Sequence, residues 1–202
     1  AVIVNVQRGG PGLGGIQPSQ SDYFQATKGG GHGDYHMIVL TPASVQEMAS
    51  LTMLAFDLAD KYRTPVMILA DGTIGQMMES VVLPDEVKEK KFEKPWALTG
   101  TKMMREHNIV NSLYLSPEKL EETNIERFER YRKIEENEVR VESYMMDDAS
   151  YALVAFGIAS RVAKASVNEL RALGVKCGLI RPLTVWPFPS KVINEASYRV
   201  EA

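Results

Sequence analysis

The sequence predicts an α/β protein built on parallel sheets. Short apolar runs alternate along the chain with longer segments of helical periodicity, the pattern expected of strand–helix–strand units. A glycine-rich stretch follows the first apolar run directly, at the strand end where parallel sheets bind ligands. The 202 residues are 45% hydrophobic and 24% charged, which excludes a disordered chain.

Five apolar runs are predicted as strands. Their apolar residues are mostly consecutive, which is typical of strands covered on both faces. The runs are 1–7, 37–41, 65–70, 151–156 and 176–180. Because a run rich in β-branched residues begins at Ala1 with no cap or turn before it, we expect the chain to be part of a longer one, cut inside a sheet.

Two segments are predicted as helices, 41–63 and 158–173, because apolar residues recur there at steps of three or four. Ser44 and Glu47 fit a capping box at the start of the first helix, and Thr41 followed by Pro42 is an equally good start. Gly174 is placed to end the second helix in a left-handed conformation. This spacing predicts right-handed crossovers between parallel strands.

The chain divides into three predicted parts: an α/β unit at 1–80, a charged connector at 81–145 that is partly an exposed helix, and a second α/β unit at 146–202. Three prolines surround two aromatic residues between Arg181 and Pro189, which predicts a rigid apolar loop and no helix or central strand. Trp186 and Phe188 in this loop either contact another domain or subunit or pack inward. Arg181 is placed for an ion pair across that interface.

The charge and cysteine content excludes several classes of protein. A net charge of −3 gives no basic excess for nucleic acid or an anionic membrane, and no apolar run approaches the ~20 residues of a membrane helix. The single Cys177 excludes an internal disulfide, a Cys-only zinc site and an iron–sulfur cluster on this chain. The histidines lack metal-ligand spacing, so we predict no metal site, and a reducing cytoplasm is the expected compartment.

Nine of the 15 glycines lie between Arg8 and Asp34, the strongest local signal in the sequence. Gly10, Gly12 and Gly15 formally match the G-x-G-x-x-G motif of dinucleotide-binding proteins. Prolines interrupt the motif, however, and Asp34 precedes the second predicted strand, whereas a ribose-binding acid ends it. The dinucleotide interpretation is therefore rejected.

Arg8 is the candidate binding residue. It follows the first strand directly, and its guanidinium can hold a carboxylate through two hydrogen bonds. The neighbouring glycines let backbone N–H groups approach an anion. The alternative is a surface arginine paired with Asp22 or Asp34.

Several motifs along the chain are specific in combination. They are Val4-Asn5-Val6-Gln7-Arg8-Gly9-Gly10-Pro11-Gly12, Gln17-Pro18-Ser19-Gln20-Ser21-Asp22, Gly31-His32-Gly33-Asp34, Lys61-Tyr62-Arg63-Thr64-Pro65-Val66, Ile134-Glu135-Glu136-Asn137-Glu138 and Arg181-Pro182-Leu183-Thr184. Together they resemble the α-type subunit of 2-oxoacid:ferredoxin oxidoreductases, most closely the branched-chain type that oxidises 2-oxoisovalerate. The resemblance covers nearly the whole chain and is weakest at 84–106.

The resemblance implies the fold and the reaction. It implies a thiamine-diphosphate pyrimidine-type domain followed by a domain like the C-terminal one of transketolase. The enzyme would convert a 2-oxo acid, coenzyme A and oxidised ferredoxin into acyl-CoA, CO₂ and reduced ferredoxin. Thiamine diphosphate with Mg²⁺ would be shared with a β-type subunit, and iron–sulfur clusters would lie on other, γ-type subunits.

The resemblance also implies site residues. Arg8 matches the position that contacts the substrate carboxylate, and Gly9, Gly10 and Gly12 would line the same cleft. His32 and Asp34 are possible cleft residues, although a hydrogen bond from His32 to backbone is the alternative. The family's catalytic glutamate lies upstream of residue 1, so no catalytic residue is assigned.

Two other interpretations stay open. The chain could be a non-catalytic α/β assembly or anion-binding module, or a 2-oxoglutarate-specific member of the same family. Asp71-Gly72 resembles part of a thiamine-diphosphate metal motif but lacks its companions, so we interpret it as a turn at a strand end.

Overall fold

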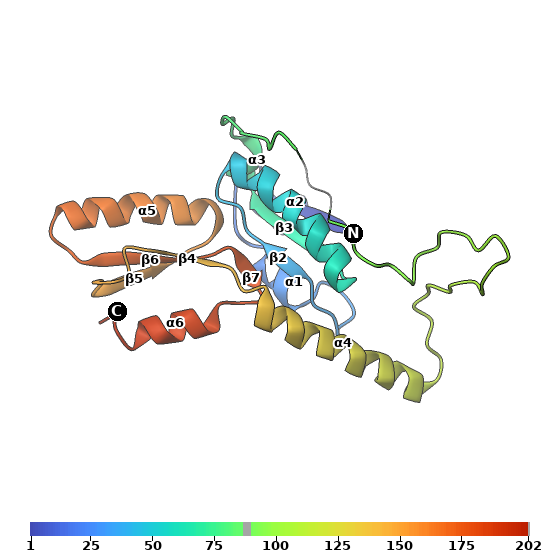
Figure 1. Ribbon diagram of the computed structural model, residues 1–202. Coiled ribbons are helices and arrows are strands. Elements are labelled where there is room, and N and C mark those ends of the chain that lie inside the picture. Colours follow the sequence, from blue (N-terminus) through green and yellow to red (C-terminus); the bar gives the residue numbers. More distant parts are fainter. Residues whose placement is uncertain (87–89, 202) are drawn as a thin grey trace.

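The computed structural model describes residues 1–86 and 90–201, and it contains two β-sheets side by side with helices packed against them (Figure 1). The first sheet has the order β1-β3-β2-β7 and the second β4-β6-β5. The strands are β1 (Val2–Gln7), β2 (Ile38–Leu40), β3 (Val66–Asp71), β4 (Val141–Tyr144), β5 (Tyr151–Val154), β6 (Cys177–Pro182) and β7 (Thr184–Trp186). The helices are α1 (Tyr23–Lys28), α2 (Val45–Tyr62), α3 (Gly72–Gln76), α4 (Pro117–Asn137), α5 (Gly157–Ala172) and α6 (Ser190–Ser197).

The first sheet confirms three predicted parallel strands. β3 pairs in parallel with β1 on one side and β2 on the other, and every residue of β2 and β3 is buried. β1 lies at the edge, and Ile3, Val4 and Val6 are exposed. Ile3 and Val4 point to opposite faces of the sheet, so covering on both faces was wrongly predicted for β1. It was also wrongly predicted for β5, where Tyr151, Leu153 and Val154 are exposed.

Helix α2 covers the first sheet and begins at the predicted cap. The hydroxyl of Ser44 accepts a hydrogen bond from Glu47 N at 3.1 Å, and the Glu47 carboxylate accepts one from Ala43 N at 2.7 Å. The helix buries Leu51 and Leu58 against the sheet and ends just before Arg63, whose φ is 45°. The predicted capping residues are thus confirmed, with the Glu47 side chain reaching the residue before the cap.

The second sheet carries α5 on one face. The helix spans almost the predicted segment, and Val167 is completely buried against Cys177 and Leu179 of β6. Gly174 follows the helix with φ of +84°, as expected of a left-handed helix end.

The structure corrects the prediction of an apolar loop after Arg181. β6 continues to Pro182, and Thr184–Trp186 forms the short strand β7, antiparallel to β2. Pro182 is tolerated because it ends its strand, where no further ladder bond is required of its nitrogen. Trp186 is buried, whereas Phe188 is half exposed, so only one of the two aromatic residues packs inward.

The predicted connector contains α4 and the unpredicted strand β4, which pairs antiparallel to β6. Ser116 caps α4, and Tyr131 and Ile134 near its end are buried in the core of the first sheet. The first turns of α4 extend away from both sheets (Figure 1). Residues 87–89 of the predicted connector lie outside the described residues. Among the described helices, none combines the length and the apolarity needed to cross a membrane.

Candidate functional site

Arg8 lies exposed at the carboxyl end of β1, in the first position beyond the strand. Its backbone forms an antiparallel bridge with Pro18, and its carbonyl oxygen accepts a hydrogen bond from the hydroxyl of Ser21 at 3.1 Å. The guanidinium Nη1 donates to the carbonyl oxygen of Gly15 at 3.2 Å. This contact leaves the other guanidinium donors available to a ligand within the described part of the chain.

The glycine segment after Arg8 closes on itself. Gly9 N donates to the Gln17 carbonyl at 2.9 Å, and Gly15 N donates back to the Gly9 carbonyl at 2.8 Å. Gly10 and Gly12 are exposed, and a Cβ on either would meet no atom within 4 Å. The predicted residues Arg8, Gly9, Gly10 and Gly12 therefore form one loop, with open space on its outer side.

Gly14 is the position where this loop requires glycine. Its φ is +60°, and a Cβ there would lie 1.8 Å from the Gly9 carbonyl oxygen and 2.7 Å from Arg8 Nη1. A side chain at this position would displace the backbone and the guanidinium together. The absence of a side chain at Gly14 thus leaves room for the Arg8 guanidinium in its observed position.

In the described structure the Arg8 guanidinium is not paired with Asp22 or Asp34. Asp22 accepts a hydrogen bond from the side chain of Asn5 at 3.2 Å, and its backbone N donates to Gln7 Oε1 at 3.0 Å. Gln7 is buried beneath the loop. Sequence reasoning missed Gln7 and Asn5 because their partners lie beyond the strand and no local pattern points to them.

His32 lies in a different concavity from the Arg8 loop, and Asp34 contacts Arg127 of α4. His32 lines a hollow of about 810 Å³ beside β1, together with Tyr35 and Arg127, and neither Arg8 nor its glycine loop contributes to its walls. The Asp34 carbonyl oxygen accepts a hydrogen bond from Arg127 Nη1 of α4 at 2.9 Å. The structure therefore does not bring these two residues to Arg8. Arg127 was also missed, because it lies 93 residues from its partner in the sequence.

Asp71 ends β3 and is buried, as expected of the predicted turn at a strand end. One carboxylate oxygen accepts hydrogen bonds from Thr73 N and Ile74 N and so caps α3, and the other accepts one from Ile158 N at 3.3 Å. The amide of Gln20 donates to the Phe156 carbonyl at 2.9 Å beside it. These contacts join the floor of the Arg8 loop to the start of α5.

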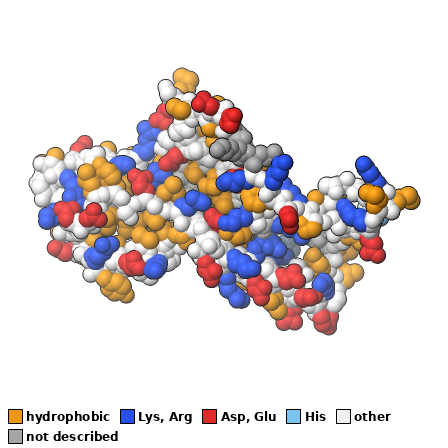
Figure 2. All heavy atoms as spheres, viewed as in Figure 1, with side chains coloured by type: hydrophobic (Ala, Val, Ile, Leu, Met, Phe, Trp, Pro, Cys, Tyr) orange, Lys and Arg blue, Asp and Glu red, His pale blue; other side chains and the backbone are white. Residues whose placement is uncertain are grey.

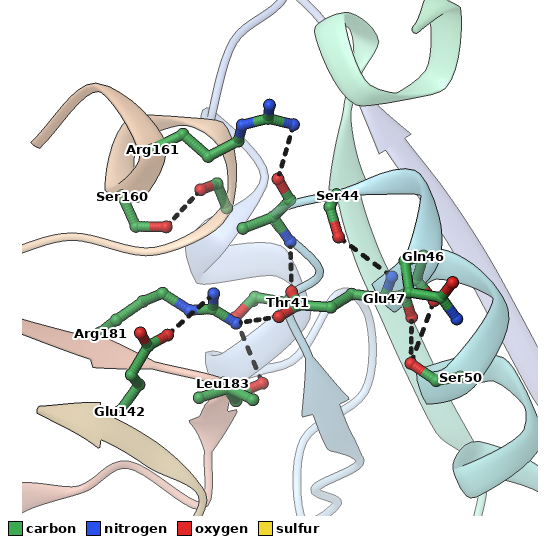
Figure 3. A network of polar contacts seen from close by, with 12 residues as sticks. Thr41, Ser44, Gln46, Glu47, Ser50, Glu142, Ser160, Arg161, Arg181 and Leu183 are labelled. Carbon is green, nitrogen blue, oxygen red and sulfur yellow. Dashed lines mark hydrogen bonds and ion pairs between the residues drawn. The ribbon is translucent and has the colours of Figure 1, made fainter. Parts of the chain in front are cut away.

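An ion-pair network joins the two sheets, and Arg181 is at its centre (Figure 3). Its guanidinium lies 2.7 Å from Glu47 of α2 and 3.1 Å from Glu142 of β4. Arg161 of α5 donates to the Ala43 carbonyl at 3.4 Å. The predicted ion pair of Arg181 across the interface is confirmed.

Glu79, which follows α3, contacts both the start of α2 and α5. The backbone N–H of Val45 and the guanidinium of Arg161 hold the pKa of the Glu79 carboxyl below its usual value. Glu79 is thus ionised between α2 and α5, which suits assembly of the two units.

The donor set at Arg8 determines which group fits there. It consists of guanidinium N–H groups with open glycine backbone beside them, which suits an anion such as a carboxylate. In residues 1–86 and 90–201 no three His, Cys, Asp or Glu side chains converge as metal ligands. The residues at Arg8 therefore fit an acidic ligand.

Two family models match consecutive parts of the chain. The model of the thiamine-diphosphate-binding domain of pyruvate flavodoxin/ferredoxin oxidoreductase matches residues 1–146. The model of pyruvate:ferredoxin oxidoreductase core domain II matches residues 149–202.

Curated relatives extend beyond this chain. Ketoisovalerate oxidoreductase subunit VorB of Methanothermobacter marburgensis is 54% identical over 195 residues, which cover 96% of this chain and 55% of the relative. 2-Oxoglutarate synthase subunit KorA of Methanocaldococcus jannaschii is 34% identical, over 96% of this chain and 59% of the relative. The chain thus spans little more than half the length of these relatives.

A solved structure shares the fold. The 2-oxoglutarate:ferredoxin oxidoreductase from Magnetococcus marinus, with 2-oxoglutarate, coenzyme A and succinyl-CoA bound, superposes with a TM-score of 0.77 at 24% identity, over 99% of this chain and 40% of that one. The fold is accordingly a thiamine-diphosphate-binding α/β domain followed by core domain II. The chain belongs to the pyruvate flavodoxin/ferredoxin oxidoreductase family.

Proposed function

We propose that this chain is part of a subunit of an enzyme complex that oxidatively decarboxylates 2-oxoisovalerate. Coenzyme A accepts the acyl group, CO₂ is released, and ferredoxin accepts the electrons. The observation that carries the proposal is the exposed guanidinium of Arg8 beside its glycine loop, in a chain 54% identical to a ketoisovalerate oxidoreductase subunit.

Arg8 binds the carboxylate of the 2-oxo acid and fixes its orientation. Its free N–H groups match the two carboxylate oxygens, and Gly10 and Gly12 leave room for close approach. The carboxylate leaves as CO₂, so we assign Arg8 to binding and orienting the substrate and not to stabilising charge in the decarboxylation step.

The metal, the diphosphate contacts and the iron–sulfur clusters belong to other polypeptides. Thiamine diphosphate, when bound, supplies the carbon-centred catalysis that side chains lack. We assign its Mg²⁺ and diphosphate contacts to a β-type subunit and the iron–sulfur clusters to a γ-type subunit, with ferredoxin as the acceptor. The complex works in the cytoplasm, and neither nucleic acid nor a membrane is among its partners.

A second candidate substrate is 2-oxoglutarate, which the KorA relatives at 34% identity favour. Its distal carboxylate needs a second cation, whereas the side chain of 2-oxoisovalerate needs an apolar wall. A non-catalytic assembly or anion-binding module is the alternative in another class.

The test is a panel of 2-oxo acids supplied to the intact purified complex with coenzyme A and a low-potential acceptor dye. We expect 2-oxoisovalerate to give the highest kcat/KM. Preference for 2-oxoglutarate would replace the assigned substrate, and a complex lacking turnover but binding 2-oxo acids would favour the binding module.

A further inference from the structure

A cavity of about 340 Å³ lies at the amino ends of β2 and β3, where α4 packs against the first sheet. Its walls come from the residues just before each strand, 35–37 and 63–65, and from three residues of α4. Arg8 lies at the opposite edge of the same sheet, because β1, β2 and β3 are parallel and Arg8 follows β1. The six residues of β3 separate the two edges by roughly 20 Å. The cavity is therefore not part of the Arg8 site.

Three arginines line this cavity, Arg63, Arg127 and Arg130, and no acidic residue does. Figure 2 shows Lys and Arg side chains gathered beside α4, on the side toward the first sheet. Within residues 1–86 and 90–201, no carboxylate forms an ion pair with any of the three arginines. Three positive charges around one cavity repel one another, so an anion inside it would be stabilised.

The acidic residues nearest to these arginines in the sequence do not line the cavity. They are Asp34, Asp60, Glu126 and Glu129. Asp60 is paired with Lys94 at 2.6 Å, and the other three are exposed to solvent. The positive charge of the cavity is therefore not neutralised from within the described part of the chain.

Neutral contacts orient all three guanidinium groups. Arg127 Nη1 donates to the Asp34 carbonyl at 2.9 Å, and Arg130 Nη1 donates to the Arg63 carbonyl at 3.4 Å. The Arg63 guanidinium carbon lies 4.6 Å from the ring centre of Trp96. Each guanidinium has five N–H donors, so these contacts leave most of them available to a ligand in the described structure. The three arginines are held in place while their charge remains uncompensated.

The size and the donors of the cavity favour a phosphate group. Ligand pockets in proteins usually have volumes of about 300–1,000 Å³, so this cavity suits a small molecule or one group of a larger one. A carboxylate offers two oxygens, which a single guanidinium can bind. A phosphate group offers about three acceptor oxygens and nearly two negative charges, and the arginine fork matches it geometrically. Three guanidinium groups around one space therefore fit a phosphate group better than a carboxylate.

We propose that this cavity binds the phosphate group of a small molecule through Arg63, Arg127 and Arg130. The site bridges α4 and the first sheet, since Arg63 precedes β3 and the other two arginines belong to α4. Arg63 belongs to the motif at 61–66, which the Arg8 site does not use. The phosphate site is independent of the substrate assigned to Arg8, because the two sites lie at opposite edges of the sheet.

Calorimetric titration of the intact complex with inorganic phosphate, in a phosphate-free buffer, tests the site. Arg130→Gln and Arg63→Gln should each weaken phosphate binding by about tenfold or more, because each removes a charged donor. Arg132→Gln is the matched control, since Arg132 lies on the same helix, is exposed and does not line the cavity. This variant should bind phosphate as wild type does.

Two results of this titration would overturn the proposal. Absence of phosphate binding that depends on Arg130 would favour an acidic segment of another subunit as the partner of the arginines. Equal weakening in Arg130→Gln and Arg132→Gln would show a general effect of charge on the helix and no site in the cavity.

A titration with coenzyme A present identifies the source of the phosphate group. If coenzyme A abolishes the binding event that Arg130→Gln weakens, coenzyme A supplies the group. If the event persists, the ligand is free phosphate or another phosphate ester. Both results uphold the site and differ only in the molecule that carries the phosphate.

Hydrogen exchange measures the bridge between α4 and the first sheet directly. At a phosphate concentration near the wild-type dissociation constant, exchange in residues 127–137 should slow in wild type and in Arg132→Gln, because the ligand stabilises the docked helix. The segment 157–172 of α5 does not line the cavity and should be unchanged. Equal slowing of residues 127–137 in Arg130→Gln would contradict the proposal.

Discussion

Arg181 Nη2 lies 2.7 Å from Glu47 Oε1, and this contact joins the strand at the centre of the second sheet to the helix that covers the first. Its Nη1 lies 3.1 Å from Glu142 on the neighbouring strand, so one planar guanidinium spans both units. Arg181 is almost completely buried. The relative position of the two units therefore depends on the shape of this side chain as well as on its charge.

Arg181→Lys should lower the free energy of unfolding by about 1–3 kcal/mol, the scale of losing a charged hydrogen bond. Lysine keeps the charge but is a point donor and cannot serve both carboxylates with the same geometry. Urea unfolding of the assembled protein measures the change.

Lys164→Gln is the matched control, because Lys164 pairs with the same Glu142 at 2.9 Å but is 44% exposed. An exposed pair contributes roughly 0–1 kcal/mol, so this variant should be close to wild type. Equal losses of unfolding free energy in both variants would show that contacting two carboxylates with one guanidinium gives Arg181 no special role.

The sequence predicted the elements whose signals are local. The apolar runs and helical periodicity located β1, β2, β3, β5, β6, α2 and α5 within a few residues. β7 was missed because its three residues pair with β2, which lies far upstream, and because prolines flank it. β4 was missed because its stabilisation comes from β6 and not from its own short and partly polar sequence.

The candidate site shows the same division. Arg8 and its glycine loop are consecutive, so the sequence placed them together, and the family resemblance gave them a role. His32 and Asp34 were grouped with them through sequence proximity, but after the intervening α1 the residue His32 lines another hollow beside β1 and Asp34 contacts α4. Contacts such as Asp34 with Arg127 depend on the position of α4, which no local pattern specifies.

Arg8→Ala should lower kcat/KM for the 2-oxo acid, because the substrate carboxylate loses its charged partner. The loss of transition-state stabilisation calculated from the kcat/KM ratio should be about 2–4 kcal/mol. Arg8→Lys should recover part of this loss, since a point charge remains without the two-donor geometry. Steady-state kinetics of the reconstituted complex measure both. Arg199→Ala, an exposed arginine after α6, is the control. Unchanged kinetics in Arg8→Ala would remove Arg8 from the site.

Gly14→Ala and Gly12→Ala separate crowding from backbone conformation. Both positions have φ near +60°, but an added Cβ meets Gly9 and Arg8 at Gly14 and no atom within 4 Å at Gly12. The left-handed conformation costs about 1–2 kcal/mol in both variants. Gly14→Ala should additionally raise KM by displacing the guanidinium. Equal KM values in the two variants would show that crowding at Gly14 does not position Arg8.

The Glu138 carboxyl makes the free energy of unfolding depend on pH in the acid range. The carboxyl is buried, and burial alone raises its pKa, but hydrogen bonds from Lys61 and Tyr62, each at 2.7 Å, and from Arg140 at 3.1 Å outweigh burial. The net effect lowers the pKa of Glu138 below its ordinary value of 4.5. Its contribution to stability is therefore fully present above pH 4.5 and is lost as the pH falls through the lower folded-state pKa.

Glu138→Gln should accordingly lower the free energy of unfolding by about 1–3 kcal/mol at neutral pH, since three donors lose an ionised acceptor. The difference from wild type should shrink below pH 4.5, where the unfolded chain takes up the proton more readily than the native carboxylate does. Unfolding curves from about pH 3 to about pH 7, a range that brackets the ordinary carboxyl pKa, measure this on wild type, Glu138→Gln and the exposed control Glu122→Gln. A difference that stays constant over the whole series would mean that the ionised carboxylate of Glu138 is not what stabilises the contact between α2 and the end of α4.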